Sequence, residues 1–138
     1  MFISYSRADS TIAEKLYDSL TAQGKRVWYD KKKLTIGGNF MEEIRKAIRT
    51  TKYFVPILSN NIIKEKDESH VYRNEWAQAE EVAISMGRTF IIPLAEQGFD
   101  FYRAALPEKL QQHNAKFFNG IDGISAAVKD IIHEMNKD

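Results

Sequence analysis

The segment from Ser69 to Glu81, with the sequence SHVYRNEWAQAEE, spaces its acidic residues so that one of them can point into the protein. On a helix, Tyr72 and Trp76 share one apolar stripe, because residues three and four apart lie on the same face. Glu75 lies at the edge of this stripe, whereas Glu80 lies farther from it on the other side. A carboxylate in an apolar setting costs free energy unless it has a partner or a function, so Glu75 is the first candidate site residue.

Glu75 also has a purely structural explanation. Acidic residues are common near the beginning of a helix, because the helix dipole favours negative charge there. On the residues alone, both a functional and a structural role for this glutamate stay open.

The composition indicates one globular domain over residues 1–138. Of the 138 residues, 43% are hydrophobic and 28% are charged, and the formal net charge of +1 gives no footprint for nucleic acid. No apolar run approaches the roughly 20 residues that a membrane span needs. The chain has no cysteine, which fits a reducing, cytoplasmic compartment, and its three histidines lack metal-ligand spacing.

Apolar runs alternate with helical patterns along the chain. The expected strands cover residues 1–5, 26–29, 53–58, 89–94 and 115–118. The expected helices run from a cap at Ser6 or Asp9 to Gly24, and over 40–49, 69–87, 107–112 and 120–136. This order predicts a mostly parallel sheet with helices on both faces.

Two segments carry more specific expectations. Pro56 removes one backbone donor from the third expected strand, which indicates an edge strand or a bulge. Residues 60–68 are polar and charged, which predicts an exposed loop.

In such folds, ligands bind at the carboxyl ends of the strands. The residues expected there are Ser6, Arg7, Asp30, Ser59 and the pair at 95–96. Glu75, one turn into its helix, is expected near this edge, and Glu80 would lie about 7.5 Å deeper.

Six segments, in order, resemble the TIR (Toll/interleukin-1 receptor) domain family, most closely its bacterial and NAD-cleaving members. They are FISYSRAD at 2–9, VWYD at 27–30, LTIGGNF at 34–40, ILS at 57–59, SHVYRNEW at 69–76 and GRTFIIPL at 87–94. The resemblance covers nearly the whole chain and weakens after about residue 94.

The resemblance implies a flavodoxin-like three-layer fold with five parallel strands in the order 2-1-3-4-5. It also implies that the loop from Asp30 to Asn39 gates the ligand and takes part in self-association. Enzymatic members use a glutamate on the third helix to cleave NAD+ between nicotinamide and ribose, giving ADP-ribose or a cyclic isomer. NAD+ is then the substrate, and no cofactor is expected.

Two glutamates compete for that catalytic position. Ser69, Val71 and Glu75 keep the family spacing, but Val71 replaces the usual tryptophan. Trp76 and Glu80 instead form a literal WxxxE pattern. Glu75 is preferred because it keeps the serine spacing and lies nearer the inward face and the strand ends, and Glu80 stays the alternative.

The resemblance also suggests a substrate-binding set. Its members are Ser6, Arg7, Trp28, Asp30, Leu34, Phe40 and Ser59. The aromatic rings could stack on nicotinamide or adenine, and the polar groups could bind ribose or phosphate. Core packing, helix capping and turn formation are the structural alternatives.

Two functions therefore follow from the resemblance. The first is an NAD+ nucleosidase of bacterial antiphage signalling, activated by self-association, in which a carboxylate stabilises the positive charge developing on ribose. The second is a non-catalytic adaptor that works only through TIR–TIR contacts, or a virulence effector that mimics host TIR signalling.

Overall fold

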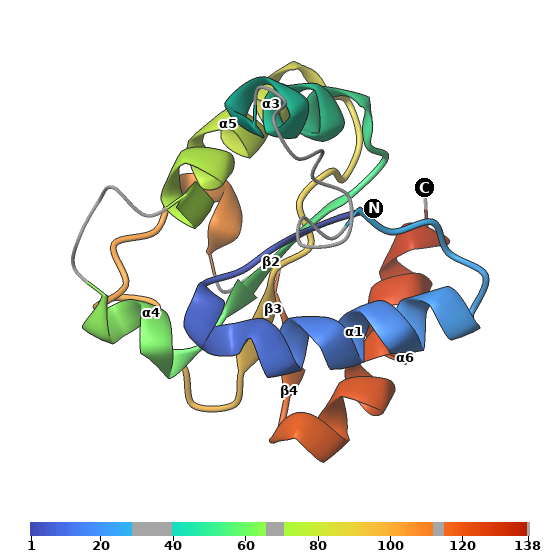
Figure 1. Ribbon diagram of the computed structural model, residues 1–138, viewed down its shortest axis with the longest axis vertical. Helices are drawn as coiled ribbons and strands as arrows, with labels where there is room; N and C mark the ends of the chain where they lie inside the picture. The colour runs from blue at the N-terminus through green and yellow to red at the C-terminus, as the bar shows by residue number, and fades with distance from the viewer. Residues whose placement is uncertain (29–39, 66–70, 112–114, 138) are drawn as a thin grey trace.

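The computed structural model describes residues 1–28, 40–65, 71–111 and 115–137. These residues form three layers, with a parallel sheet between two pairs of helices (Figure 1). The strands lie side by side in the order β1 (Phe2–Ser4), β2 (Phe54–Leu58), β3 (Leu94–Glu96) and β4 (Lys116–Phe118). The predicted flavodoxin-like α/β class is confirmed.

The strand predicted at 26–29 is represented in the described part of the chain by a bridge at Trp28, which pairs parallel with Phe2. The Ile3 N–H donates to the Trp28 carbonyl at 3.1 Å, whereas the Phe2 N–H donates to the Tyr53 carbonyl at 2.8 Å. Successive residues of a strand face opposite neighbours, so Trp28 lies on the side of β1 away from β2. This is the place of the second strand in the predicted order 2-1-3-4-5.

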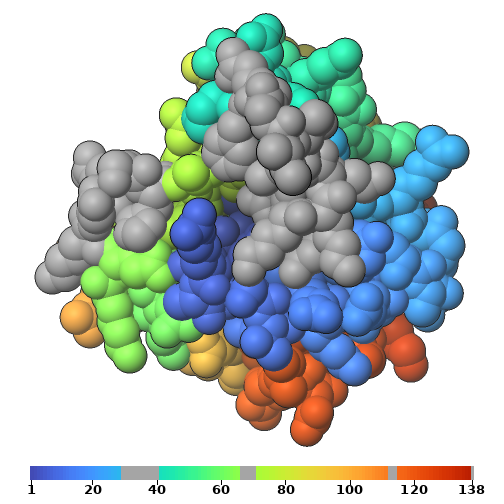
Figure 2. Space-filling view, viewed as in Figure 1, coloured from blue at the N-terminus to red at the C-terminus, as the bar shows by residue number. Residues whose placement is uncertain are grey.

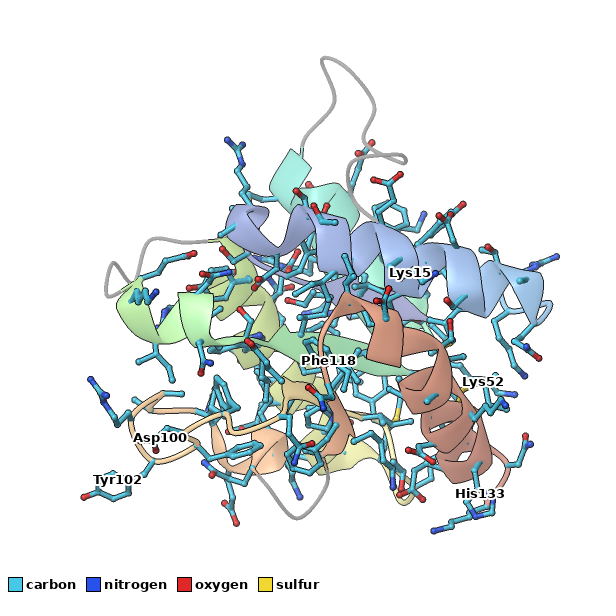
Figure 3. The ribbon with its side chains drawn as sticks, turned by 90° about the horizontal axis from the view of Figure 1, so that it is seen from below. Lys15, Lys52, Asp100, Tyr102, Phe118 and His133 are labelled. Carbon is cyan, nitrogen blue, oxygen red and sulfur yellow. The ribbon has the colours of Figure 1, made fainter. Side chains whose placement is uncertain are left out.

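One pair of helices covers each face of the sheet (Figure 1). Helices α1 (Ser10–Ala22) and α6 (Ile124–Met135) pack together on one face, and α3 (Phe40–Thr50) and α5 (Val71–Ser85) pack together on the other. Shorter elements connect them: η1 (Arg7–Asp9), α4 (Asn60–Lys64), η2 (Glu108–Leu110) and η4 (Ile121–Gly123). Phe118 of β4 is buried in the core between the sheet and α6 (Figure 3).

The first strand divides its side chains between the two faces. Ile3 and Tyr5 join the apolar core under α1 and α6, whereas Phe2 joins the core under α3 and α5. Because strand side chains alternate, Ser4 and Ser6 follow Phe2 toward the α3 and α5 side. This alternation places two hydroxyls under α5 at the carboxyl end of β1.

The edge-strand prediction from Pro56 is wrong, because β2 lies between β1 and β3. Phe54 directs its backbone groups toward the β3 side, and Pro56, two residues on, faces the same way. Pairing with that side is interrupted between the Phe54–Ile91 bridge and the Ile57–Leu94 pair. The register is the same before and after the interruption, so no extra residue is inserted as it would be in a bulge. The N–H that Pro56 lacks falls in this gap between paired residues.

Pro93 delays the strand predicted at 89–94. The chain pairs once at Ile91 and forms continuous strand only from Leu94 to Glu96. Since proline has no N–H to donate, regular pairing resumes after Pro93 and not before it. The observed strand meets the predicted range at the Ile91 bridge and at Leu94, and the rest of it lies beyond residue 94.

The exposed loop predicted at 60–68 is wrong over its first half, which is helix α4. The Ser59 hydroxyl caps this helix by accepting a hydrogen bond from the Asn61 N–H at 3.2 Å. Ile62 is buried with only 1% of its surface exposed, so one apolar side chain fixes the helix to the core. Residues 66–68 lie outside the described residues.

Ile44 tests the apolar face of α3. Its side chain is fully buried, and replacement by alanine should lower the free energy of unfolding by about 2–5 kcal/mol through lost contacts and a cavity. Urea denaturation measures the change. Arg45→Ala, next to it on the exposed side, is the matched control and should change stability by about 0.5 kcal/mol or less. Equal effects of the two substitutions would contradict the packing described here.

Candidate functional site

Buried polar side chains gather at the carboxyl ends of β1 and β2. In the described part of the chain, the buried polar and charged residues are Ser4, Ser6, Asp9, Ser59 and Glu75, each with 3% or less of its surface exposed. Together with Glu65 we call them the rim cluster. Polar groups are costly to bury, so their concentration at one edge of the sheet marks this edge as the candidate site.

Glu75 lies in the second turn of α5 with 2% of its surface exposed. Its Oε1 atom accepts a hydrogen bond from the Ser4 hydroxyl at 2.7 Å. The inward orientation predicted from the helical spacing is therefore confirmed. The hydroxyl offsets part of the cost of burying a carboxylate and fixes the direction of one of its oxygens.

Glu80 lies elsewhere on the same helix. It is half-buried, and its Oε2 atom accepts a hydrogen bond from the backbone N–H of Lys109 at 3.3 Å. This contact ties α5 to the segment around η2 and not to the rim cluster. The two competing glutamates thus have different surroundings, one at the strand ends and one beside a surface turn.

Glu65 joins β1 to α5 through its carboxylate. Its Oε1 accepts from the Ser6 hydroxyl at 2.5 Å, and its Oε2 accepts from the Tyr72 hydroxyl at 3.1 Å. Burial, and then the negative charge of Glu65, raise the pKa of the Tyr72 phenol to about 12. Sequence reasoning missed Glu65 because the segment around it was interpreted as a loop.

Asp9 joins η1 to the beginning of α4, and Figure 2 shows the blue N-terminal segment against the green segment that contains α4. Its carboxylate accepts from the Ser59 hydroxyl at 2.5 Å and from the Asn61 side-chain amide at 2.8 Å. Burial raises the pKa of the Asp9 carboxyl, and the charges of Glu65 and Glu96 add to this, while the two hydrogen bonds oppose it. Asp9 occupies the cap position of α1 without a side-chain capping bond, so its partners come from the tertiary structure alone.

The structure brings some predicted substrate-binding residues together. Ser6 and Ser59 belong to the rim cluster, and Arg7 is exposed beside them on η1. Asp30 and Leu34, with the whole Asp30–Asn39 loop, lie outside the described residues, as does the side chain of Phe40. Roles of these residues in binding stay predictions.

Trp28 does not join the rim cluster. Its ring stacks on Phe2 with centroids 6.2 Å apart, as core packing would require. It also lines a cavity of about 900 Å³ with Met1, Lys25 and Thr50, which precede the strands. This cavity therefore lies toward the opposite end of the sheet from Glu75.

Other kinds of site find little support in the described residues. No group of three histidine, cysteine or acidic side chains among them is placed to hold a metal ion. His133 is exposed on α6, away from the rim cluster (Figure 3). Within the same residues, no helix combines the length and apolar composition that a bilayer crossing requires.

The family model of the TIR domain matches residues 1–132. The chain belongs to the TIR domain family. This match covers the four strands and the rim cluster, and it ends within α6. The TIR resemblance predicted from the six sequence segments is thereby confirmed.

Three curated relatives show more local similarity to this TIR domain. NAD(+) hydrolase TcpC of Escherichia coli O6:H1 is 33% identical over 66 residues, which are 47% of this chain and 22% of TcpC. The probable 2′ cyclic ADP-D-ribose synthase TcpO of Methanobrevibacter olleyae is 35% identical over 75 residues, 54% of this chain and 22% of TcpO. NAD(+) hydrolase PdTIR of Paracoccus denitrificans is 29% identical over 99 residues, 68% of this chain and 30% of PdTIR. The matched part of this chain thus spans less than a third of each relative.

Asp9 gives the site a pH-dependent stability. Because its folded pKa is raised above the ordinary value of 3.8, folding favours the protonated carboxyl. Its contribution to stability is fully present below that value and is lost as pH rises through the folded pKa. Asp9→Asn removes this titration, so the free energy of unfolding of wild type minus that of the variant should fall as pH rises from about 4. Urea denaturation at several pH values measures this difference, and a constant difference would contradict the assignment.

Proposed function

We propose that this TIR domain cleaves NAD+ between nicotinamide and ribose, with Glu75 as the catalytic carboxylate. The observation that carries the proposal is the burial of Glu75, which exposes only 2% of its surface. Its carboxylate accepts a hydrogen bond from Ser4 at the carboxyl end of β1. Ligands of parallel α/β folds bind at this end of the sheet. The names of the three relatives, two NAD(+) hydrolases and one probable 2′ cyclic ADP-D-ribose synthase, support the same substrate.

The proposed chemistry needs charge stabilisation more than proton transfer. When the bond from ribose C1 to nicotinamide breaks, its electron pair leaves with neutral nicotinamide, and positive charge develops on the ribose. A fixed carboxylate beside the ribose stabilises that charge and accepts hydrogen bonds from its hydroxyls. Attack of water on C1 with loss of a proton gives ADP-ribose, and attack by a hydroxyl of the same molecule gives a cyclic isomer.

Ser4 orients this carboxylate in the proposed mechanism. It donates to one oxygen of Glu75, which holds the side chain in place before substrate arrives. Preorganisation of this kind matters because a charged group that must reorganise during the reaction stabilises the transition state less. Ser4 is thus a positioning residue that the sequence reading did not single out.

The remaining predicted residues complete the proposed substrate site. Ser6 and Ser59 belong to the rim cluster with Glu75, where their hydroxyls donate to Glu65 and Asp9. The exposed guanidinium of Arg7 supplies positive charge for the diphosphate. Trp28, Asp30, Leu34 and Phe40 belong to the proposal through the family resemblance only.

The biological setting is also part of the proposal. Activation by self-association through the Asp30–Asn39 loop and a role in bacterial antiphage signalling come from the family resemblance. A cytoplasmic location follows from the substrate, since NAD+ is an intracellular metabolite.

Glu75→Gln tests the catalytic role. The amide keeps the size and one acceptor of the side chain but loses its charge, so the rate of nicotinamide release should fall by about 10²–10³-fold. Glu80→Gln is the matched control on the same helix and should keep the rate within about twofold. Release is measured by chromatography with the protein at high concentration, because the proposed activation requires self-association.

Two outcomes would contradict this assignment. A larger loss from Glu80→Gln than from Glu75→Gln would transfer the catalytic role to Glu80. Absence of release from concentrated and assembled wild-type protein would instead favour the non-catalytic TIR–TIR adaptor.

A further inference from the structure

We propose that Glu65 is a positioning residue, which holds the first turns of α5 against β1 and thereby fixes the carboxylate of Glu75. This inference rests on the proposed function of Glu75. It assigns a role to a residue that neither the family resemblance nor the sequence pattern singled out.

Two bridges join the end of β1 to α5. The first is direct, from the Ser4 hydroxyl to Glu75 at 2.7 Å. The second runs from Ser6 through the carboxylate of Glu65 to the Tyr72 hydroxyl, with distances of 2.5 and 3.1 Å. Ser4 and Ser6 point to the same side of the strand because they are two residues apart. Both sets of hydrogen bonds therefore connect the end of β1 to the first turns of α5.

The second bridge lies about one helical turn from the first on α5. Tyr72 precedes Glu75 by three residues, so both side chains rise from neighbouring positions of the helix surface. Tyr72 is buried with 3% of its surface exposed. A displacement of the helix at Tyr72 would consequently be transmitted to Glu75 through less than one turn of rigid backbone.

Glu65 is itself held by contacts that do not depend on Glu75. Its backbone carbonyl accepts a hydrogen bond from the guanidinium of Arg73 at 3.2 Å, which is a further link to α5 itself. It directly follows α4, which is fixed by buried Ile62 and by the Asp9 contacts with Ser59 and Asn61. Glu65 can thus transmit the position of η1 and α4 to α5.

Removal of Glu65 would leave two hydroxyls without their acceptor. Ser6 and Tyr72 are both buried, each with 3% of its surface exposed, so the loss of this acceptor leaves two hydroxyls that must find a new partner. The first turns of α5 would shift to solvate the Tyr72 hydroxyl. A displacement of about 1 Å in a catalytic group can cost about 100-fold in rate.

A direct catalytic role for Glu65 is the competing explanation. Both of its carboxylate oxygens accept hydrogen bonds from buried protein hydroxyls, which makes the carboxylate a structural acceptor. Glu75 accepts the Ser4 hydroxyl through its Oε1 at the carboxyl end of β1, where ligands of parallel sheets bind. The arrangement therefore favours contact of Glu75, and not of Glu65, with the ribose.

Glu65→Ala and Glu65→Gln in the full chain test this role by nicotinamide release from NAD+. We expect Glu65→Ala to lower kcat by about tenfold to 100-fold while KM stays within about twofold. Glu65→Gln should recover part of kcat, because its amide oxygen can still accept from one hydroxyl. Glu81→Gln, exposed on α5, is the matched control and should behave as wild type.

A double-mutant cycle with Tyr72→Phe separates positioning from catalysis. If Glu65 acts through Tyr72, the loss in Glu65→Ala/Tyr72→Phe should be no larger than that of the more damaging single variant. Additive losses, or a loss in Glu65→Gln as large as that in Glu75→Gln, would overturn the positioning role.

Amide hydrogen exchange of α5 provides a measurement without NAD+. The first turns of α5 should exchange faster in Glu65→Ala than in wild type and remain unchanged in Glu81→Gln. Unchanged exchange in Glu65→Ala, with an active wild-type enzyme, would overturn the positioning role and leave the proposed function intact. Failure of wild type to release nicotinamide would overturn the proposed function and this role with it.

Discussion

The hydrogen bond from Ser4 to Glu75 is the contact around which the site is built. It joins two residues 71 positions apart in the chain, both nearly inaccessible to solvent. Burial of a carboxylate costs several kcal/mol unless polar groups surround it, so the neighbouring chain must supply donors and hold them in place. The Ser4 hydroxyl at the end of β1 meets this demand for Glu75, and the hydroxyls of Ser6 and Ser59 do so for Glu65 and Asp9.

The two faces of the sheet use β1 in different ways. Under α1 and α6 its side chains are Ile3 and Tyr5, which continue an apolar core. Under α5 the apolar Phe2 is followed by Ser4 and Ser6, whose hydroxyls donate hydrogen bonds to glutamate carboxylates. Apolar packing therefore stabilises the middle of this layer, while hydrogen bonds replace it at the strand ends. A polar rim on an apolar base is the arrangement that ligand sites of parallel sheets require.

Membership of the TIR family shows the fold of this domain but not its activity. The family membership fixes the order of strands and helices, but one fold hosts proteins with different functions, so activity has to be argued from the site. The rim cluster supplies that argument through a buried acid, oriented by a hydroxyl, at the edge of the sheet where ligands bind. Its acids also join distant parts of the chain, because Asp9, Glu65 and Glu75 each accept a hydrogen bond from the hydroxyl of a serine distant in sequence.

The βα order, the apolar faces of the helices and the inward position of Glu75 were all predictable from the sequence, because these depend on periodicities within single elements. The contacts of Asp9 and Glu65 and the central place of the strand with Pro56 became visible only in the folded chain. Asp9 bonds to a serine 50 positions away, and Glu65 bonds to one 59 positions away. No local pattern encodes such pairs, since they form only when the parallel sheet brings the ends of β1 and β2 to one edge.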